Sequence, residues 1–245
     1  MPITPYAKRV LIKLSGESLS SSSGYGLNIS TISPIITSLI ELYSKGIQIA
    51  LVIGGGNFLR GSKEKFDGKV SRSSIDQIGM LATIMNSLAL RDLFHRENIP
   101  VEIVSSKKID GIVDSMSPFN VKQLLESGHV VIFAGGTGNP FVTTDSCSSL
   151  RAIEIDADAI LKATTVDGIY DLDPSKYAHA KKYNWISFDD VIKKELAVMD
   201  LAAFTQCRDF NIPICVFNMD GKNNLNNVLF QKNIGTWVSK EKIYD

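Results

Sequence analysis

The stretch "VLIKLSGES", residues Val10 to Ser18, specifies the first strand of the fold and places a charge inside it. Three apolar residues precede Lys13 and one follows it, so this lysine interrupts a run that is typical of a fully buried strand. A lysine in such a run usually extends its ammonium group toward solvent along its apolar stem. The alternative is a cation held at the end of the strand for a ligand, and the neighbouring motifs help to distinguish the two.

This apolar run is the first of several of strand length, and helical patterns separate them. The expected strands are residues 10–14, 47–53, 101–104, 130–134, 159–161 and 214–217. The expected helices include 32–43, started by Ser33 and Pro34, and 75–88, capped by Ser73 or Ser74. Strands that alternate with helices predict an α/β fold with a central, mostly parallel sheet that is covered on both faces. No stretch is typical of a linker, so residues 1–245 are expected to form a single domain.

Charge and cysteine content exclude several classes of protein. Lys and Arg together number 26, as do Asp and Glu, so the net charge is zero and there is no obvious basic stripe. A nucleic-acid polymer is therefore not an expected partner. The three cysteines have no CxxC spacing, which argues against a disulfide framework and against a zinc site. The N-terminus lacks the apolar segment of a signal peptide, and no run approaches about 18 apolar residues, so we expect a cytoplasmic protein without a membrane partner.

Glycine-rich segments follow two of the expected strands, at the edge of a parallel sheet where ligands bind. They are "GGGNFLRG" at 54–61 and "GGTGNPFVTTD" at 135–145. Glycines at a strand end let successive backbone N–H groups point at an anion, so two such loops suggest two phosphate-bearing groups. A tight turn explains a single glycine cluster equally well, but three glycines in a row followed by Arg60 favour a phosphate cradle. Neither segment has the pattern of a P-loop or of a dinucleotide-binding loop.

Four charged residues fall beside these loops, namely Lys13, Arg60, Asp145 and Lys162. Asp145 alone is typical of a helix N-cap, and Lys162 ends the expected strand "AILK". All four are nevertheless expected at the carboxyl edge of one sheet. Phosphoryl transfer requires positioned cations and donors more than a nucleophile from the protein, so this set predicts a phosphotransferase with these four catalytic residues.

No other chemistry has comparable support in the sequence. The three histidines, His95, His129 and His179, are scattered without the spacing of a catalytic triad or a metal site, and no metal-ligating residue is predicted. Cys147 is expected near a helix N-terminus, a position that can lower the pKa of a thiol. It has no basic residue adjacent in sequence, so we expect it to be a small helix residue.

Several longer motifs resemble those of a known family. They are "KLSGE" (13–17), "VIGGGNFLRG" (52–61), "DQIGMLATIMNSLALRD" (76–92), "GTGNPFVTTDS" (136–146), "LKATTVDGIYDLDP" (161–174) and "VMDLAAF" (198–204). In this order they resemble the bacterial UMP kinases of the amino acid kinase superfamily, essentially from end to end. The resemblance implies a three-layer αβα sandwich that transfers the γ-phosphoryl group of ATP to UMP in de novo pyrimidine nucleotide biosynthesis. It also implies Mg²⁺ carried by the ATP phosphates, a homohexamer, and a chain whose N-terminal part binds mainly UMP and whose C-terminal part binds mainly ATP.

The resemblance further implies roles for individual residues. Lys13 would stabilise the transferring group, Asp76 would bind the ribose hydroxyls of UMP, and Asp145 would organise the lysines and the magnesium-bound phosphates. The implied ATP-binding residues are Lys13, Leu14, Ser15, Gly16, Gly56, Arg60, Thr164, Tyr170 and Asp173. The implied UMP-binding residues are Gly55, Asp76, Thr137, Gly138, Asn139, Pro140, Phe141, Val142, Thr143 and Thr144.

One departure concerns regulation. Many members of this family are activated by GTP and inhibited by UTP, and their GTP site between subunits uses basic residues. This chain keeps candidate effector residues at Gly24, Gly26, Arg91 and His95, but it has Glu102 and His129 where such members carry arginine. GTP activation is therefore expected to be weak or absent.

Two other functions remain open at this point. The first is a nucleotide-binding storage or sensor protein on the same fold that does not turn over its ligand. Retention of Lys13, Arg60 and Asp145 together argues against it, because a pure binder does not need a catalytic lysine and its organiser. The second is a kinase of the same superfamily that acts on a carboxylate or carbamate. Asp76 and the motif "GTGNPFVTTD" argue against that alternative.

Overall fold

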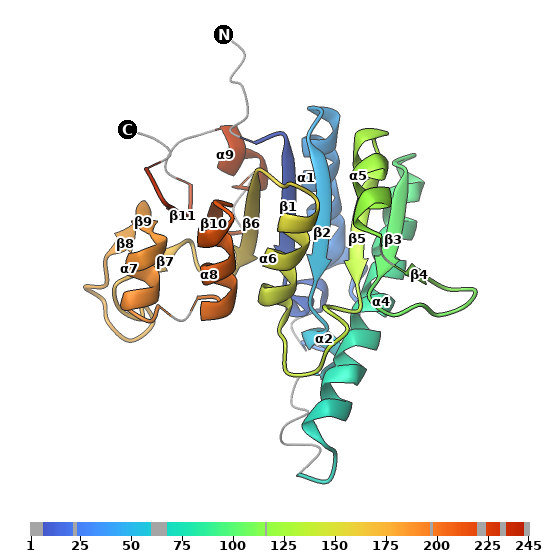
Figure 1. Cartoon of the computed structure of the whole chain (residues 1–245), viewed down its shortest axis with the longest axis horizontal. Coiled ribbons are helices and arrows are strands. Elements are labelled where there is room, and N and C mark those ends of the chain that lie inside the picture. Colours follow the sequence, from blue (N-terminus) through green and yellow to red (C-terminus); the bar gives the residue numbers. More distant parts are fainter. Residues whose placement is uncertain are drawn as a thin grey trace.

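The computed structural model describes residues 7–21, 24–59, 68–115, 117–196, 198–219, 224–230 and 234–242. Among them, the main sheet has nine strands in the order β4-β3-β5-β2-β1-β6-β10-β11-β9 (Figure 1). Their bounds are β1 (Arg9–Leu14), β2 (Gln48–Ile53), β3 (Val101–Ser105), β4 (Asp114–Ser115), β5 (Val130–Ala134), β6 (Ala159–Thr164), β9 (Trp185–Ser187), β10 (Ile214–Asn218) and β11 (Thr236–Ser239). Neighbours pair in parallel except β10 with β11, which confirms the predicted mostly parallel sheet. A separate antiparallel pair joins β7 (Ile169–Tyr170) to β8 (Lys182–Tyr183).

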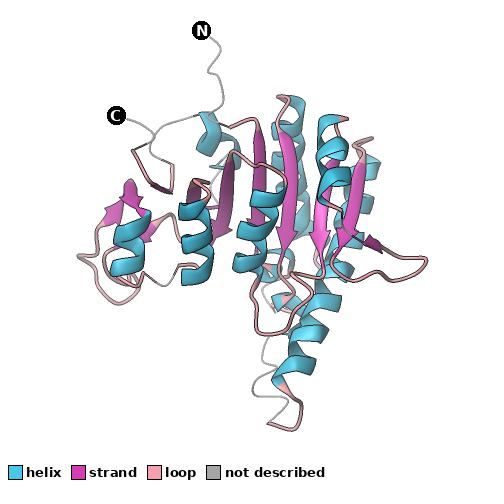
Figure 2. Ribbon diagram, in the orientation of Figure 1, coloured by secondary structure: helices cyan, strands magenta, loops and turns pink. Residues whose placement is uncertain are grey.

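Helices cover both faces of this sheet, as Figure 2 shows. One core cluster joins the sheet to α1 (Ile29–Ser44), α4 (Arg72–Arg96) and α9 (Asn224–Phe230). A second cluster joins the opposite face to α5 (Pro118–Glu126), α6 (Thr144–Glu154), α7 (Phe188–Lys193) and α8 (Leu201–Asp209). The predicted three-layer αβα sandwich is thereby confirmed. In the part of the chain that the structure describes, no helix is sufficiently long and apolar to cross a membrane.

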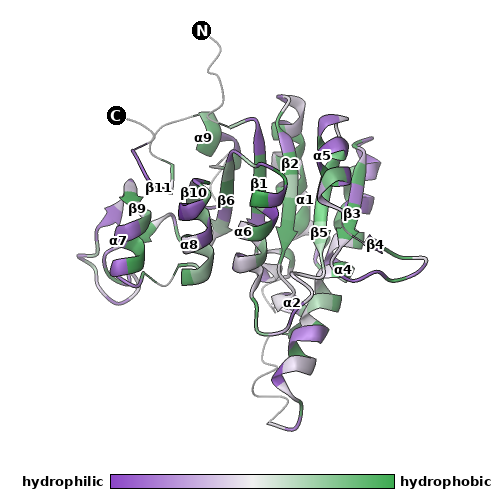
Figure 3. Ribbon diagram, in the orientation of Figure 1, coloured by the Kyte–Doolittle hydropathy of each residue, from purple (hydrophilic) through white to green (hydrophobic). Residues whose placement is uncertain are grey.

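Side-chain alternation in the central strands decides which helical layer each residue meets. In β1, Ile12 and Leu14 belong to the core beneath α1 and α4, whereas Leu11 belongs to the core beneath α6. Successive side chains of a strand point to opposite faces, so Lys13 lies on the α6 face. The same alternation in β6 puts Lys162 on that face. Figure 3 shows how predominantly apolar the central strands around these lysines are.

Two helices begin earlier than predicted. α1 starts after Asn28, whose side chain accepts a hydrogen bond from the backbone N–H of Thr31, so Pro34 lies inside the helix. α4 starts after Ser71, whose hydroxyl accepts a hydrogen bond from the backbone N–H of Ser74. The first turn of each helix is mostly polar and carries little apolar periodicity, so the hydrophobic pattern placed both starts too late.

Two short helices lie at the carboxyl edge of the sheet. They are the 3₁₀ helix η1 (Gly16–Leu19), directly after β1, and α2 (Gly56–Leu59), directly after β2. The N-terminal half of α4 extends beyond the same edge (Figure 1). These elements and the loop before α6 surround the predicted site.

Candidate active site

Lys13, Asp145 and Lys162 come together at the carboxyl edge of the sheet. Lys13 is the direct neighbour of Lys162 across β1 and β6, and both face the first turn of α6, which carries Asp145. Lys13 Nζ lies 3.2 Å from Asp145 Oδ1, and Lys162 Nζ donates to Asp145 Oδ2 over 2.6 Å. The side chains of Lys13, Lys162 and Asp145 are 12, 9 and 14% exposed, so water screens their charges weakly. Lys13 is therefore a partly buried, paired cation, and not a lysine that reaches solvent.

Arg60, the fourth predicted catalytic residue, lies outside the described residues. Lys162 was predicted to end its strand, but β6 continues to Thr164. The extra residues still pair with β10, which supplies the backbone partners that the sequence pattern did not reveal.

Thr143, rather than Asp145, caps α6. The Thr143 hydroxyl accepts hydrogen bonds from the backbone N–H groups of Asp145 and Ser146. Capping, which was the alternative role for Asp145, therefore belongs to a residue two positions earlier. A capping carboxylate would bond to its own helix, whereas Asp145 in the first turn faces the two lysines. Its negative charge also suits the positive end of the helix dipole.

Burial and charge act against each other in this cluster. Burial alone would raise the pKa of Asp145, but the charges of Lys13 and Lys162 outweigh it and hold the pKa below the usual 3.8. Burial lowers the pKa of Lys162 below its usual 10.5, and the charge of Asp145 offsets only part of that effect. Two ammonium groups beside one carboxylate leave a formal excess of one positive charge, which suits an anionic ligand.

The cluster is tied to a segment that the sequence left without a role. Lys162 Nζ also donates to the Val198 carbonyl. Asp200 accepts hydrogen bonds from the hydroxyls of Thr143 and Ser146, the latter over 3.0 Å. The motif "VMDLAAF" was the available signal, but local pattern does not reveal that this turn lies against the N-terminus of α6. Val198 and Asp200 are therefore parts of the site that sequence reasoning missed.

A divalent cation fits beside Asp145. Within the described ranges, no group of three or more His, Cys, Asp and Glu side chains could hold a metal ion by itself. Asp145 Oδ1 is nevertheless buried and accepts no hydrogen bond, its contact with Lys13 being an ion pair only. Mg²⁺ is commonly bound by one or two carboxylates together with substrate phosphates. The donor set therefore fits a magnesium ion that arrives with a nucleotide.

The glycines at the ends of β1 and β2 pack closely against one another. A Cβ atom on Gly16 would lie 2.6 Å from Gly56 N and 2.7 Å from the Gly54 carbonyl oxygen. A Cβ atom on Gly55 would lie 2.6 Å from the Gly79 carbonyl oxygen in α4. Any other residue at Gly16 or Gly55 would push these backbones apart. Close packing thus explains these glycines, and a phosphate cradle stays a prediction.

A first cavity, of about 180 Å³, lies between α4, the turn after β2 and the loop before α6. We call it the acceptor cavity. The predicted UMP-binding residues that line it are Gly55, Asp76, Thr137, Val142, Thr143 and Thr144, and Gly56 lines it as well. Gly138, Asn139, Pro140 and Phe141 are not among its lining residues. The structure therefore brings only part of the predicted UMP set together.

Asp76 ties the loop before α6 to α4. Its Oδ2 accepts a hydrogen bond from the backbone N–H of Phe141 over 2.8 Å, and its Oδ1 accepts one from Arg72 Nε over 2.8 Å. Phe141 has a φ of +67° and is 71% exposed. The carboxylate predicted to meet ribose hydroxyls thus has two protein partners in this conformation.

A second cavity, of about 550 Å³, lies on the α1 side of the sheet edge. Two of the predicted ATP-binding residues, Ser15 and Thr164, line it. Tyr170 and Asp173 do not: the Tyr170 hydroxyl donates to Asp167 Oδ1 over 2.6 Å, and Asp173 Oδ1 accepts hydrogen bonds within its own turn. Tyr170 and Asp173 therefore do not lie with Ser15 and Thr164 around the second cavity.

The candidate effector residues are not gathered in one place. Arg91 and Glu102 line a third cavity, of about 320 Å³, and His95 does not. Gly26 instead contacts the active-site region, because its N–H donates to the Asn57 carbonyl and its carbonyl accepts from Asn57 Nδ2, each over 2.9 Å. Because Glu102 carries a negative charge, it reduces the net positive charge of the cavity that Arg91 also lines.

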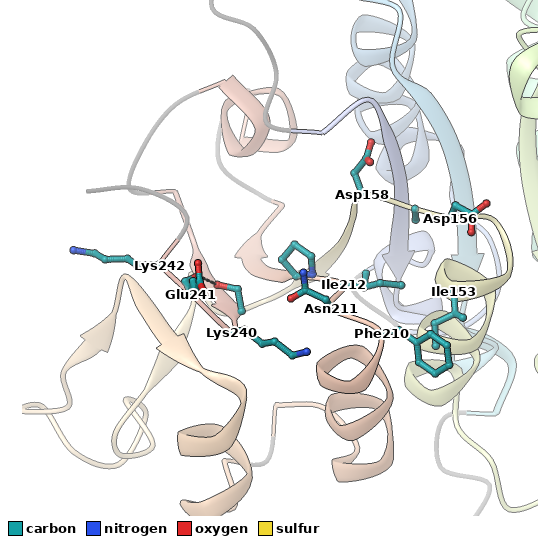
Figure 4. Close-up of a pocket in the computed structure, with 12 residues that line it drawn as sticks. Ile153, Asp156, Asp158, Phe210, Asn211, Ile212, Lys240, Glu241 and Lys242 are labelled. Atoms are coloured by element: carbon teal, nitrogen blue, oxygen red, sulfur yellow. Dashed lines mark hydrogen bonds between the residues drawn. The ribbon is translucent and has the colours of Figure 1, made fainter.

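A fourth cavity, of about 790 Å³, is shown in Figure 4. It is lined by residues that precede β6 and β10, such as Asp158 and Ile212, and by Ser239 to Lys242. These positions are at the amino ends of the two parallel strands, opposite the edge that carries Lys13. None of the predicted site residues lines it.

The reactivity of the three cysteines tests whether their side chains are buried as the structure shows. All three are free and buried, and burial raises the pKa of Cys147 to about 11. The N-terminus of α6 therefore does not activate this thiol, in agreement with the expectation of a small helix residue. At pH 8 a thiol with this pKa is about 0.1% ionised, so we expect native protein to react with Ellman's reagent at least about 100-fold more slowly than unfolded protein. Release of three thiols per chain in guanidinium is the control, and one fast thiol in native protein would contradict the structure.

Known proteins share this fold and these motifs. The model of the "Amino acid kinase family" matches residues 8–218. A uridylate kinase from Francisella tularensis subsp. holarctica is 52% identical over 235 residues, which cover 96% of this chain and 94% of that protein. A uridylate kinase from Coxiella burnetii is 48% identical over 236 residues, covering 96% and 97%. The crystal structure of UMP kinase from Bacillus anthracis has a TM-score of 0.92 at 37% identity, covering 96% of this chain and 97% of that one. The resemblance of the motifs is thus confirmed, and the chain belongs to the amino acid kinase family and, within it, to the uridylate kinases.

Proposed function

We propose that this chain is a UMP kinase, which transfers the γ-phosphoryl group of ATP to UMP and releases UDP and ADP. The observation that carries the proposal is the ion-paired cluster of Lys13, Asp145 and Lys162 at the carboxyl edge of the sheet, where residues that follow the strands line two cavities. Ser15, two residues after Lys13, lines the second cavity, of about 550 Å³. Thr144, next to Asp145, lines the acceptor cavity. A donor in one cavity and an acceptor in the other would present their phosphates to the same lysines.

The reaction requires positive charge more than a base. A phosphate oxygen of UMP attacks the γ-phosphorus, the bond to the bridging oxygen breaks, and the electron pair leaves with ADP. The attacking oxygen is already ionised, so no proton has to be removed. Lys13 and Lys162 neutralise charge on the transferring group, while Asp145 holds both ammonium groups in place before the reaction begins. Asp145 Oδ1, which is buried and accepts no hydrogen bond, would hold a Mg²⁺ ion that arrives with ATP, and such an ion would supply further neutralisation.

The proposal keeps the remaining assignments that the resemblance implies. Leu14, Gly16, Arg60, Tyr170 and Asp173 serve ATP, and Gly138, Asn139, Pro140 and Phe141 serve UMP. The acceptor cavity is smaller than the roughly 300–1,000 Å³ of typical ligand pockets, so the exposed 137–142 loop has to shift when UMP binds. The proposal also takes residues 1–245 as a single domain, in a cytoplasmic homohexamer.

One assay tests the activity against both alternatives. ADP release is measured with ATP, Mg²⁺ and one acceptor at a time, chosen from UMP, CMP, acetylglutamate, aspartate and carbamate. We expect turnover with UMP and much less with the others. Binding of UMP without turnover would support the storage or sensor alternative, and turnover with a carboxylate or carbamate would support the other superfamily activity.

Regulation by GTP provides a separate prediction. Because Glu102 places a carboxylate in the same cavity as Arg91, we expect GTP to raise the rate less than about twofold at fixed ATP and UMP. Glu102→Arg, which restores a cation at this exposed position, should increase the response. A several-fold activation of the unmodified protein would show that Glu102 does not weaken the effector site. The same assay with UTP tests the inhibition that the resemblance implies.

A further inference from the structure

α4 presents a row of small and polar residues to the backbone of the acceptor cavity. Asp76, Gly79, Thr83 and Asn86 are spaced three or four residues apart, so they lie on one face of the helix. Thr83 and Asn86 are 3% and 0% exposed. Polar side chains buried to this degree are retained where they satisfy particular hydrogen bonds, and their partners here include the backbone atoms of two loops.

Thr83 holds the loop that follows β5. Its Oγ1 accepts a hydrogen bond from the backbone N–H of Gly135 over 2.8 Å and donates to a carbonyl of its own helix. Gly135 has a φ of +74°, and a Cβ atom there would lie 2.6 Å from Ser106 Oγ. The backbone is therefore confined on both sides at this point. The next two residues, Gly136 and Thr137, line the acceptor cavity together with Thr83.

Asn86 holds the turn that follows β2. Its Nδ2 donates to the Gly54 carbonyl over 2.8 Å and to Asn57 Oδ1 over 2.9 Å. Asn57 Nδ2 donates back to Asn86 Oδ1 and to the Gly26 carbonyl, each over 2.9 Å. Both amides are fully buried, and every N–H of the pair has a protein acceptor. The two residues after Gly54 line the acceptor cavity, so this amide pair fixes its second wall.

We propose that Thr83 and Asn86 are positioning residues of the acceptor cavity: by holding the backbone at Gly135 and Gly54, α4 sets the distance between the two walls. The inference rests on the proposed function, because it takes the acceptor in this cavity to be UMP. Neither residue lines the second cavity, in which ATP is proposed to bind. Loss of the hydrogen bond to Gly135 or to Gly54 should therefore weaken the binding of UMP more than the binding of ATP.

Thr83→Val tests the inference with little change of shape. The valine keeps the branched side chain but leaves the buried N–H of Gly135 without its acceptor, so the wall can relax. We expect KM for UMP to rise about tenfold, while KM for ATP changes less than about twofold. Thr83→Ser keeps the hydroxyl and should restore KM for UMP.

Ser87→Ala is the matched control. Ser87 is also fully buried on α4, and its hydroxyl donates to the Thr83 carbonyl within the helix, with no bond to a site loop. It should lower the melting temperature without changing KM for UMP. An equal KM for UMP in Thr83→Val and Ser87→Ala would overturn the inference, since both variants would then have only a structural effect.

Amide hydrogen exchange separates this inference from the proposed function. If the unmodified protein shows no UMP-dependent turnover, the proposed function fails, but the tie can still be measured. Exchange at Gly135 should be faster in Thr83→Val than in Ser87→Ala, and equal exchange would overturn the positioning role. If Thr83→Val does not fold, Asn86→Asp is the second variant, because it replaces the two N–H donors to Gly54 and Asn57 by an acceptor. We expect the same rise in KM for UMP. A KM for UMP equal to that of Ser87→Ala would overturn the inference.

Discussion

Lys13→Ala should lower kcat by at least about 10³-fold and leave the protein folded. The removed ammonium group lies 3.2 Å from Asp145, so the charge of the transferring phosphoryl group would lose a fixed partner. The fold should persist because Leu11, Ile12 and Leu14 around it are fully buried and Lys162 still pairs with Asp145. The measurements are ADP release at saturating ATP and UMP, and thermal unfolding followed by circular dichroism.

Lys8→Ala is the control for the change in net charge. Lys8 is exposed, and its removal alters the charge of the chain by the same amount without touching the site. Its kcat should stay within about twofold of the unmodified protein. Lys13→Arg is expected to restore little activity, because a planar guanidinium does not occupy the place of a compact ammonium group. Retention of more than a tenth of kcat in Lys13→Ala would show that Lys13 is not the stabilising cation.

Asp145→Asn should cause the largest combined loss, in activity and in stability. The amide keeps the shape of the side chain but leaves Lys13 and Lys162, which are 12 and 9% exposed, without their shared counter-charge. Removing one partner from a buried ion pair typically costs about 3–5 kcal/mol in the free energy of unfolding. Urea denaturation at pH 7 measures this loss, and kcat should fall at least about 100-fold because the lysines lose their organiser.

The pH dependence of that loss follows from the pKa of Asp145. Burial opposes ionisation, but Lys13 and Lys162 outweigh it, so the pKa lies below 3.8 in the folded protein. The ionised carboxylate therefore stabilises the fold above pH 3.8, and this contribution disappears as the pH falls through the lower folded-state pKa. The difference in stability between the unmodified protein and Asp145→Asn should be complete at pH 7 and shrink below pH 3.8.

A second substitution shows whether the unpaired charge is responsible. Adding Lys162→Met to Asp145→Asn removes one of the uncompensated cations, so the double variant should regain part of the lost stability, without regaining activity. A single Asp145→Asn variant that is as stable as the unmodified protein would mean that the cluster is not coupled through this carboxylate.

Particular elements show how far sequence pattern reaches. The six apolar runs all correspond to strands. The length and apolar character of a run are enough to recognise a strand that is long and buried. The strands β4, β7, β8, β9 and β11 have only two to four residues and carry too little pattern to be recognised. The cap of α6 was misplaced because "VTTDS" offers several capping residues in succession, and only the position of the lysines decides that Asp145 turns away from its helix.

The sequence by itself determined the α/β class, the strand that carries Lys13, the glycine-rich strand ends and the family, because each of these depends on residues close together in the chain. Only the tertiary structure decided that Lys13 and Lys162 are neighbours facing one carboxylate. It also decided that Tyr170 and Asp173 do not line the second cavity. Finally, it showed that Asn86 and Thr83 hold the two walls of the acceptor cavity. The Thr83 tie joins residues 52 positions apart. Such contacts depend on how a helix lies across the sheet, and this placement is the sum of many packing contacts that leave no local pattern in the chain.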